Sequence, residues 1–370
     1  MSNLNYLLKE INKKYGEGTV RTANEFPDLT RIPTGIFALD ASIGGGIPKG
    51  RICIFSGNES TGKTSVAKMA LAQFQNTCKN CLLKLNKCNC GNTEPHVAVM
   101  VDIEGAFDPN WFTTLGGNVD DLILFQPEFA EQGVDVVEAL VRSGEVDIIV
   151  VDSVAMMSPA DEIEKSSEDL LVGTHARLMN RMMRSVQSGM NSLGMGSRKP
   201  SVILINQLRQ KVGVLYGDNT TLPGGLGQKF ASSITVKFTA RPSELVYADK
   251  GKKDDSPLGV TIRFNVTKNK TFVPLKTGMF ILYVADSKLG AKGSINIEEQ
   301  IVDYAVNYGV IEKSGAWFTM GNEQYQGKNS VIEALINDDS LRDDITQKTM
   351  DTAITNMKFG EQSDETETEL

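Results

Sequence analysis

The sequence predicts an α/β fold with a mostly parallel central sheet. Five runs rich in β-branched residues, apolar without alternation, lie at 51–56, 97–103, 122–126, 146–151 and 201–206. Such runs suit strands that are buried on both faces, and each is followed by polar residues and a helical pattern. Alternation of strands and helices is typical of a parallel sheet covered by helices.

The segments on either side of these runs predict the remaining core elements. Apolar residues between Leu4 and Tyr15 have helical spacing, so residues 1–33 are predicted to form a short helix and a linker. The core domain is predicted to span 34–285. Antiparallel strands that extend its sheet are predicted at 233–239, 260–267 and 279–284.

The C-terminal part has a different pattern. Helical spacing around 298–308 and 331–337 predicts a small α+β domain over residues 286–350. Residues 351–370 are acidic and have few hydrophobic side chains, so we predict a disordered tail.

Composition limits the protein class. The chain has 370 residues, of which 41% are hydrophobic and 23% charged, as in ordinary globular proteins. No apolar run approaches the roughly 20 residues of a membrane span, and the N-terminus lacks a secretory pattern, so we expect a cytoplasmic protein without a membrane partner. The net charge of −8 means that any nucleic-acid site needs locally concentrated basic residues.

A phosphate-binding loop follows the first predicted strand. The pattern G-x-x-x-x-G-K-[ST] is matched by Gly57, Asn58, Glu59, Ser60, Thr61, Gly62, Lys63 and Thr64, and Ser65 continues into a helical run. A glycine-rich turn that leads into a helix directs several N–H groups at a phosphate. In this motif Lys63 reaches the β- and γ-phosphates of ATP, and Thr64 binds Mg²⁺. The alternative is a chance glycine turn.

Two carboxylates follow predicted strands. Asp152 ends one run, where a second strand supplies a ligand to the Mg²⁺ shell. Glu104 ends another, where a carboxylate can activate the attacking water. In both cases the alternative is an ordinary turn or helix cap.

Six segments together resemble a known family. They lie at 57–65, 101–109, 147–153, 205–213, 268–270 and 311–317, and they resemble in order the signature segments of bacterial-type RecA recombinases. The similarity runs from the first helix to the acidic tail. It implies a RecA-type P-loop NTPase core, with the N-terminal helix joining subunits into a filament.

The resemblance implies roles at the ATP site. Glu104 matches the catalytic glutamate, and Gln207 matches the residue that senses the γ-phosphate. Asp108 and Trp111 match the positions that hold the adenine, with Trp111 in a slot usually filled by tyrosine. Lys268 and Lys270 match a pair that reaches a neighbouring subunit's ATP; without the resemblance they would be two exposed lysines.

The resemblance also implies two DNA loops. Residues 163–174 match the first loop, with Leu171 and Val172 as candidates for insertion between bases. Arg177 and Arg184 lie seven residues apart on the following helix and match basic positions that face DNA. The second loop, 209–225, combines basic, aromatic and glycine residues in a pattern suited to single strands. Its candidate residues are Arg209, Lys211, Tyr216, Gly224 and Gly225. A plain surface loop is the alternative.

Four cysteines form a cluster where typical members of the resembling family have only a short connection. Cys78, Cys81, Cys88 and Cys90 lie in an insertion at about 77–95. Two close pairs of thiolates can complete a tetrahedral Zn²⁺ shell, which predicts a structural site. The alternatives are reduced cysteines in a loop and a three-cysteine site completed by His96. His175 and Cys53 are interpreted as packing residues.

These observations favour one function. We expect a DNA-dependent ATPase that uses ATP and Mg²⁺, forms homo-oligomeric helical filaments on single-stranded DNA, and pairs this strand with homologous duplex DNA in recombination and repair. The alternatives are a ring-forming helicase with the same core and a non-catalytic DNA-binding regulator.

Overall fold

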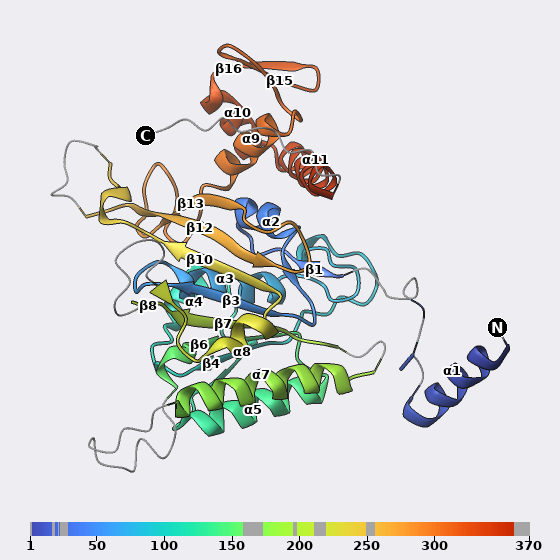
Figure 1. Cartoon of the computed structure of the whole chain (residues 1–370). Coiled ribbons are helices and arrows are strands. Elements are labelled where there is room, and N and C mark those ends of the chain that lie inside the picture. The colour runs from blue at the N-terminus through green and yellow to red at the C-terminus, as the bar shows by residue number, and fades with distance from the viewer. Residues whose placement is uncertain are drawn as a thin grey trace. The chain divides into compact units, whose positions relative to one another are not determined.

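The computed structural model describes residues 2–16, 19–20, 22, 29–157, 173–194, 198–210, 220–248 and 256–358 (Figure 1). The chain divides into two compact units. The first unit contains Met1–Thr34 and Ile47–Thr239, and the second contains Gly35–Gly46 and Ala240–Leu370. Among the described residues, no helix combines the length and apolarity that a bilayer span requires.

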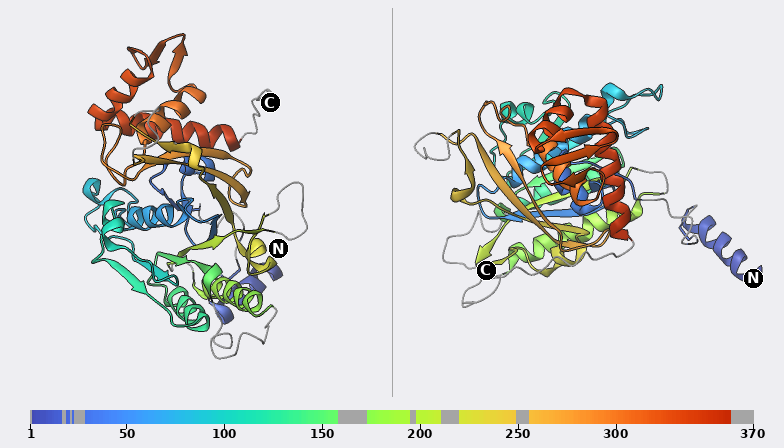
Figure 2. Two further views of the ribbon diagram at one scale, coloured as in Figure 1. Left: turned by 90° about the vertical axis from the view of Figure 1, so that its left-hand side faces the viewer. Right: turned by 90° about the horizontal axis from the view of Figure 1, so that it is seen from above.

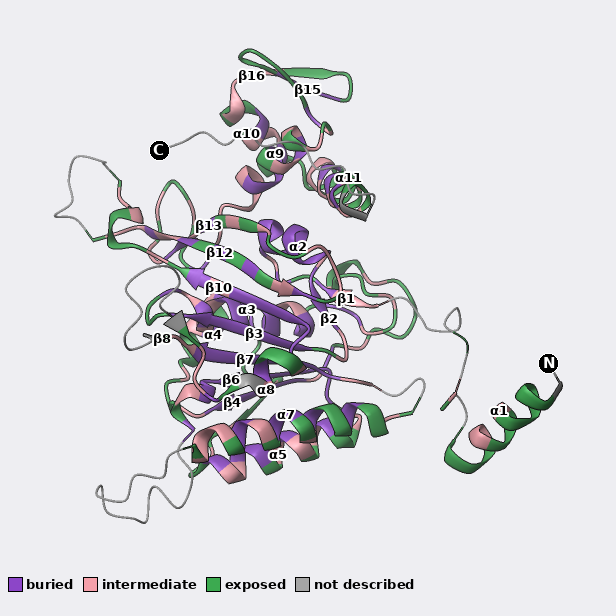
Figure 3. Ribbon diagram, in the orientation of Figure 1, coloured by how far each residue is buried: buried purple, intermediate pink, exposed green. Residues whose placement is uncertain are grey.

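A parallel sheet forms the centre of the first unit. Its strands are β3 (Ile52–Gly57), β4 (Ala98–Asp102), β5 (Leu122–Phe125), β6 (Ile148–Asp152), β7 (Ser201–Gln207) and β10 (Ile234–Thr239). Their order is β10-β3-β7-β6-β4-β5, and each neighbouring pair is parallel. Figure 3 shows that the inner strands are buried along their length. The parallel sheet predicted from the five apolar runs is therefore confirmed.

Helices cover both faces of this sheet. On one face α5 (Ala130–Ser143) and α7 (Thr174–Ser192) lie side by side, as the two views in Figure 2 show. Their residues Val134 and Met182 share a core with Val101 and Val151 of the strands. The helix α3 (Lys63–Gln75) contacts β3, β4, β6 and β7 but contributes nothing to that core, so it covers the opposite face.

The first unit contains further helices and strands outside this sheet and its covering helices. They are α1 (Ser2–Tyr15), β1 (Arg31–Ile32), β2 (Ile47–Pro48), η2 (Leu85–Lys87), α4 (Pro109–Thr114), η3 (Val154–Met156), β8 (Arg209–Gln210), β9 (Thr220–Thr221) and α8 (Leu226–Ala231). The helix predicted between Leu4 and Tyr15 is confirmed as α1.

One predicted strand direction is wrong. We expected residues 233–239 to begin the antiparallel set, but β10 pairs with β3 in parallel, with Ile234 beside Cys53. A parallel neighbour needs a crossover connection, and α8 forms part of it directly before β10. Because α8 has only 6 residues, its helical periodicity was too short to recognise.

The second unit combines an antiparallel sheet with a helical core. It contains α2 (Phe37–Ile43), η4 (Pro242–Glu244), β11 (Leu245–Val246), β12 (Gly259–Asn269), β13 (Thr277–Tyr283), α9 (Ile297–Asn307), β14 (Glu312–Ser314), β15 (Trp317–Met320), β16 (Glu323–Gln326), α10 (Lys328–Asn337) and α11 (Asp339–Lys358). The strands β11, β12 and β13 pair antiparallel, as predicted for 260–267 and 279–284. The core joins Phe37 of α2 to Ile301, Val331 and Ile345 of the C-terminal helices.

The predicted boundaries of the C-terminal part have different outcomes. The end of the core domain at residue 285 stays a prediction; within the second unit α2 packs with α9, where Phe37 lies edge-on to Tyr304 with ring centroids 5.6 Å apart. The disordered tail was predicted to begin too early, since α11 continues to Lys358. Burial of Ile345, Thr349 and Ala353 along this helix explains the difference. Residues 359–370 lie outside the described part of the chain.

A buried ionic cluster lies where β4 and β6 begin. Asp147 is fully buried, and its carboxylate lies 3.0 Å from Lys49 Nζ and 3.1 Å from His96 Nδ1. It also accepts a 3.0 Å hydrogen bond from the backbone N–H of Val97. Burial raises the pKa of Asp147, but the adjacent His96 side chain, the hydrogen bond from the Val97 N–H and the charge of Lys49 outweigh it and hold the pKa well below its ordinary value. The ionised carboxylate therefore stabilises the fold.

We predict that Asp147→Asn lowers the free energy of unfolding at pH 7 by about 3 kcal/mol, because it leaves buried partners without their counter-charge. The difference from wild type should be complete above the unfolded-state pKa of about 4 and should shrink as the pH falls below it. Urea unfolding at several pH values measures this, with the exposed Asp120→Asn as control. A difference that stayed constant down to pH 3 would contradict the role assigned to the charge.

Candidate nucleotide and metal sites

The glycine-rich loop connects β3 to α3. Gly57 ends β3, and a Cβ at this position would lie 2.4 Å from the Phe238 carbonyl oxygen and 2.7 Å from Thr61 Oγ1. Only glycine fits there without moving the backbone. Gly62 has φ 79° and caps the N-terminus of α3. The predicted loop residues between them, Asn58, Glu59 and Ser60, are exposed.

The two functional side chains of the loop lie at the start of α3. Lys63 is 6% exposed, and its Nζ donates a 2.5 Å hydrogen bond to the Asn58 carbonyl. Burial lowers the pKa of Lys63, while Asp152 and Glu104 oppose this effect. Thr64 Oγ1 donates a 2.8 Å hydrogen bond to Asp152 Oδ2 at the end of β6. The loop thus brings an ammonium group and a hydroxyl to the carboxyl edge of the sheet.

Asp152 is the most strongly perturbed carboxyl group of this edge. Burial raises the pKa of Asp152 to about 6, and the charges of Glu104 and Asp102 act in the same direction. Register pairing places Asp102 of β4 directly beside Asp152. Oxygen ligands around uncompensated negative charge are what Mg²⁺ prefers. Thr64 and Asp152 therefore fit the predicted magnesium ligands.

Glu104 is held by two neighbours. Glu104 Oε1 accepts a 2.5 Å hydrogen bond from Ser153 Oγ and a 3.2 Å hydrogen bond from Gln207 Nε2. Gln207 ends β7, where it pairs in register with Gly57. The structure thus brings Glu104, Gln207 and the glycine-rich loop to one edge, as the sequence predicted. The sequence reasoning missed Ser153, whose position directly after Asp152 was the available signal.

The two predicted adenine residues lie at the start of α4. Asp108 caps this helix, and its Oδ1 accepts hydrogen bonds of 2.9 Å from the Asn110 N–H and 3.1 Å from the Trp111 N–H. Trp111 Nε1 donates a 3.1 Å hydrogen bond to Ser65 Oγ on α3. A tryptophan ring therefore lies against the helix that follows the phosphate loop. Its role in binding adenine remains a prediction.

The sequence reasoning also missed Lys68. This lysine is 2% exposed and lies one turn after Thr64 on α3. Its Nζ is 4.9 Å from the Phe107 ring centroid. Burial lowers the pKa of Lys68, and Asp152 and Asp108 counteract this. Lys68 therefore places a second buried cation beside the acidic edge. A lysine inside a helical run looks like a surface residue in sequence.

Part of the predicted DNA-binding set is described. Arg177 and Arg184 are both exposed on α7, opposite its buried residues Met179 and Met182. Arg209 is exposed in β8, which pairs with β9. Leu171, Val172, Lys211 and Tyr216 lie outside the described residues.

The end of the second predicted DNA loop is tied to β7. Asn206 precedes Gln207, and its Nδ2 donates hydrogen bonds of 3.1 Å to the Pro223 carbonyl and 2.9 Å to Gln228 Oε1. Gly224 has φ 91°, and a Cβ there would lie 2.2 Å from Gln228 Nε2, so the turn requires glycine. Gly225 has φ 79° and precedes α8. The loop end is therefore anchored one residue away from Gln207.

The structure also describes the remaining predicted residues. Lys268 belongs to β12 and Lys270 follows it, both in the second unit, and their role across a subunit interface stays a prediction. His175 Nε2 lies 2.9 Å from the Val154 carbonyl oxygen, and Cys53 is buried in β3, as expected of packing residues.

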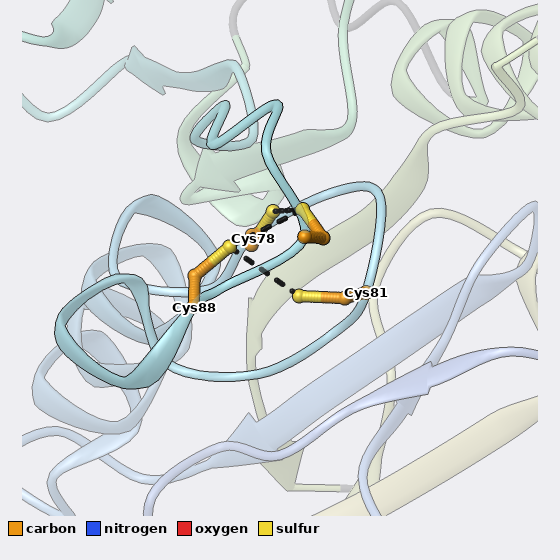
Figure 4. A group of neighbouring side chains, drawn as sticks. Cys78, Cys81 and Cys88 are labelled. Atoms are coloured by element: carbon orange, nitrogen blue, oxygen red, sulfur yellow. Dashed lines mark hydrogen bonds between the residues drawn. The ribbon is translucent and has the colours of Figure 1, made fainter.

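The four clustered cysteines converge between α3 and β4. Their sulfur atoms all lie within 4.8 Å of one another, and Figure 4 shows the thiols of Cys78, Cys81 and Cys88 directed at one another. Cys88 Sγ is 3.3 Å from Cys90 Sγ and 3.5 Å from Cys81 Sγ. Cys78 is buried, whereas Cys90 is exposed. The cluster can therefore hold a metal ion.

Neighbouring groups influence the thiols and show which side chains can act as metal ligands. The backbone N–H of Cys81 lowers the pKa of Cys78 to about 6, because it hydrogen-bonds the thiolate. Lys79 forms an ion pair with Glu94. His96 is engaged with Asp147, which argues against the three-cysteine alternative.

The chain is similar to known proteins over nearly its whole length. Residues 2–287 match the family model described as RecA N-terminal domain, and residues 299–353 match RecA C-terminal domain. The chain is 36% identical over 357 residues to Protein RecA of Chlorobaculum tepidum, covering 95% of this chain and 92% of the relative. It is 36% identical over 349 residues to Protein RecA of Latilactobacillus sakei, covering 93% and 88%.

We predict that Ser153→Ala lowers the maximal rate of nucleotide hydrolysis about tenfold, because Glu104 then keeps only its bond to Gln207. The KM for nucleotide should change less than twofold, since Ser153 does not belong to the phosphate loop. Steady-state kinetics test this, with Ser143→Ala at the end of α5 as control. A raised KM with an unchanged rate would disprove the positioning role.

Proposed function

Because the chain belongs to the RecA family of recombination and repair proteins, we propose that it is a DNA-dependent ATPase that forms helical filaments on single-stranded DNA and catalyses strand exchange. One observation carries the proposal: Lys63, Thr64, Asp152, Glu104 and Gln207 meet at the carboxyl edge of one sheet. This arrangement contains the groups that phosphoryl transfer to water requires.

Each residue has a defined task in this reaction. Bound MgATP supplies the phosphoryl group and the divalent charge. Lys63 binds the β- and γ-phosphate oxygens, and Thr64 and Asp152 hold the metal ion. Glu104 orients the attacking water and accepts its proton, while Ser153 and Gln207 fix the direction of its carboxylate.

Gln207 links the nucleotide to the DNA segment. Its amide donates to Glu104, and the adjacent Asn206 holds Pro223 and Gln228 at the end of the second loop. A movement of the β7 end toward the γ-phosphate is therefore passed to the loop through side-chain hydrogen bonds. This coupling supports the proposal that ATP binding and DNA binding favour the same state.

Assembly and DNA binding complete the proposal. Exposed apolar residues of α1, Leu4 and Leu7, suit contact with a neighbouring subunit. Lys268 and Lys270 neutralise the neighbour's phosphates in trans. The single strand and the homologous duplex are bound by residues of the two loops and by Arg177 and Arg184 of α7. We also propose that the protein acts in the cytoplasm.

We further propose that the cysteine cluster holds Zn²⁺. In a tetrahedral site with Zn–S bonds of about 2.3 Å, the sulfur atoms are about 3.8 Å apart. The observed separations of 3.3, 3.5 and 3.8 Å among Cys78, Cys81, Cys88 and Cys90 fit this value. Four thiolates leave no open position for substrate, so the site is structural.

We predict that single-stranded DNA raises the ATP hydrolysis rate of the wild type at least tenfold and that Lys63→Ala abolishes hydrolysis, because the γ-phosphate loses its charge partner. A coupled phosphate-release assay measures both. The exposed Lys288→Ala serves as control. Turnover that ignored single-stranded DNA would refute the recombinase proposal. Electron microscopy with ATP and DNA separates helical filaments from rings.

We predict that the protein purified from zinc-supplemented cells contains about one Zn²⁺ per chain and that Cys88→Ser removes most of it. Cys53→Ala is the matched control, because Cys53 lies in β3 outside the cluster. Metal analysis by mass spectrometry provides the measurement. Wild-type protein free of metal, or a Cys53→Ala variant that lost it, would rule out the assigned site.

A further inference from the structure

The cysteine loop follows directly on the helix that carries the ATP residues. α3 ends at Gln75 and β4 begins at Ala98, so residues 76–97 connect the two elements. Connections between a helix and a strand in α/β folds usually have about 2–6 residues. This longer connection begins where α3 stops, and Cys78 is already fully buried three residues later.

The end of α3 holds the loop that follows α4. Gln75 Nε2 donates a 2.9 Å hydrogen bond to the Asn118 carbonyl, and Gln75 Oε1 accepts one of 2.9 Å from the Asn118 N–H. Asn76 Nδ2 donates a 2.9 Å hydrogen bond to the Gly116 carbonyl. Gly116 and Asn118 come directly after the C-terminal cap of α4 at Leu115. These three bonds therefore fix the C-terminal end of α4.

The N-terminal end of α4 is fixed on α3 as well. Trp111 bonds to Ser65, which lies ten positions before Gln75, a distance of about 15 Å along a helix. Between the two ends, Phe112 is fully buried, and a Cβ on Gly117 would lie 2.3 Å from its ring. The helix with the predicted adenine residues is thus held against α3 at both ends.

The cysteine loop holds the end of α3, with Gln75 and Asn76, in place. Leu85 N–H donates a 2.8 Å hydrogen bond to the Asn76 carbonyl, and Cys78 N–H donates one of 2.8 Å to the Leu83 carbonyl. Thr77 and Cys78 form bridges with Lys84 and Pro95. The loop is therefore folded back on residues 76–78, and a metal ion shared by the four thiolates would close it.

The charged residues of the loop would be balanced by a bound zinc ion. Lys79, Lys84 and Lys87 contribute three positive charges. Glu94 contributes one negative charge, and a zinc ion bound by four thiolates would contribute two, so the zinc-bound loop would carry no net charge. A loop without net charge lacks the electrostatic footprint of a DNA-binding surface.

From these contacts we propose that Gln75 and Asn76, held by the metal-bound cysteine loop, are positioning residues for the adenine-binding helix α4. The metal ion thereby sets the affinity for nucleotide without taking part in hydrolysis. Removal of the metal opens the loop, frees residues 76–78, and lets the end of α4 move away from α3. The inference rests on the proposed nucleotide and zinc sites.

The test uses Trp111 as its own reporter. In a Trp317→Phe background, Trp111 is the remaining tryptophan of the chain. Its fluorescence measures the affinity for ATP in three samples. They are the zinc-loaded full-length protein, the same protein after treatment with a zinc chelator, and the zinc-loaded Gln75→Leu/Asn76→Ala variant. The exposed loop residue Asn89→Ala is the matched control, and circular dichroism monitors folding in each sample.

We expect chelation and the double substitution each to weaken ATP binding about five- to tenfold and to raise KM equally, with the maximal rate within twofold of wild type. Chelation of the double variant should add little, because both changes act through one set of contacts. Asn89→Ala should bind ATP as wild type does.

Two results would overturn the inference. One is a zinc-loaded double variant that binds ATP with wild-type affinity, and this arm holds even if the chelated protein unfolds. The other is a folded, chelated wild type with unchanged affinity. If the zinc-loaded wild type failed to bind ATP at all, the proposed function would fail instead, and the two failures are therefore distinguishable.

Discussion

The chemistry of this protein depends on buried negative charge at the carboxyl edge of a parallel sheet. β4 and β6 end side by side, so Asp102 and Asp152 are neighbours, and Glu104 follows within two residues. Burial and mutual repulsion raise the pKa of Asp152 to about 6. Lys63, Lys68 and the hydroxyl of Thr64 compensate this charge only in part, so the edge favours a divalent cation and a ligand that brings one.

The strands and the phosphate loop of this edge could be predicted from local sequence patterns. Buried parallel strands are apolar throughout, and the glycine loop has a fixed spacing, so β3, β4, β6 and β7 and the phosphate loop were found from the sequence. Ser153 and Lys68 were missed, because a serine after a strand and a lysine in a helix have no signal until tertiary contacts give them one. Likewise, no pattern near residues 233–239 indicated that the six-residue helix α8 precedes β10 and that β10 pairs with β3 in parallel.

The cysteine loop shows the same division between local and tertiary information. Spacing alone identified four thiols able to meet, and their sulfur atoms do converge. The bonds from Gln75 and Asn76 to the segment after α4 join residues about forty positions apart, and no periodicity marks such a pair. The cysteine loop, which in the sequence shows no relation to the nucleotide site, therefore adjoins the end of α3 that contacts the segment after α4.

The burial of helix α2 has a consequence for folding of the chain during its synthesis. All seven of its residues are buried, and Phe37 and Ala41 belong to one core with residues of α9, α10 and α11 from later in the sequence. A ribosome releases α2 long before it translates those helices, so the nascent polypeptide exposes an apolar segment for most of its synthesis. The second unit can complete its core only once α9, α10 and α11 have been synthesised.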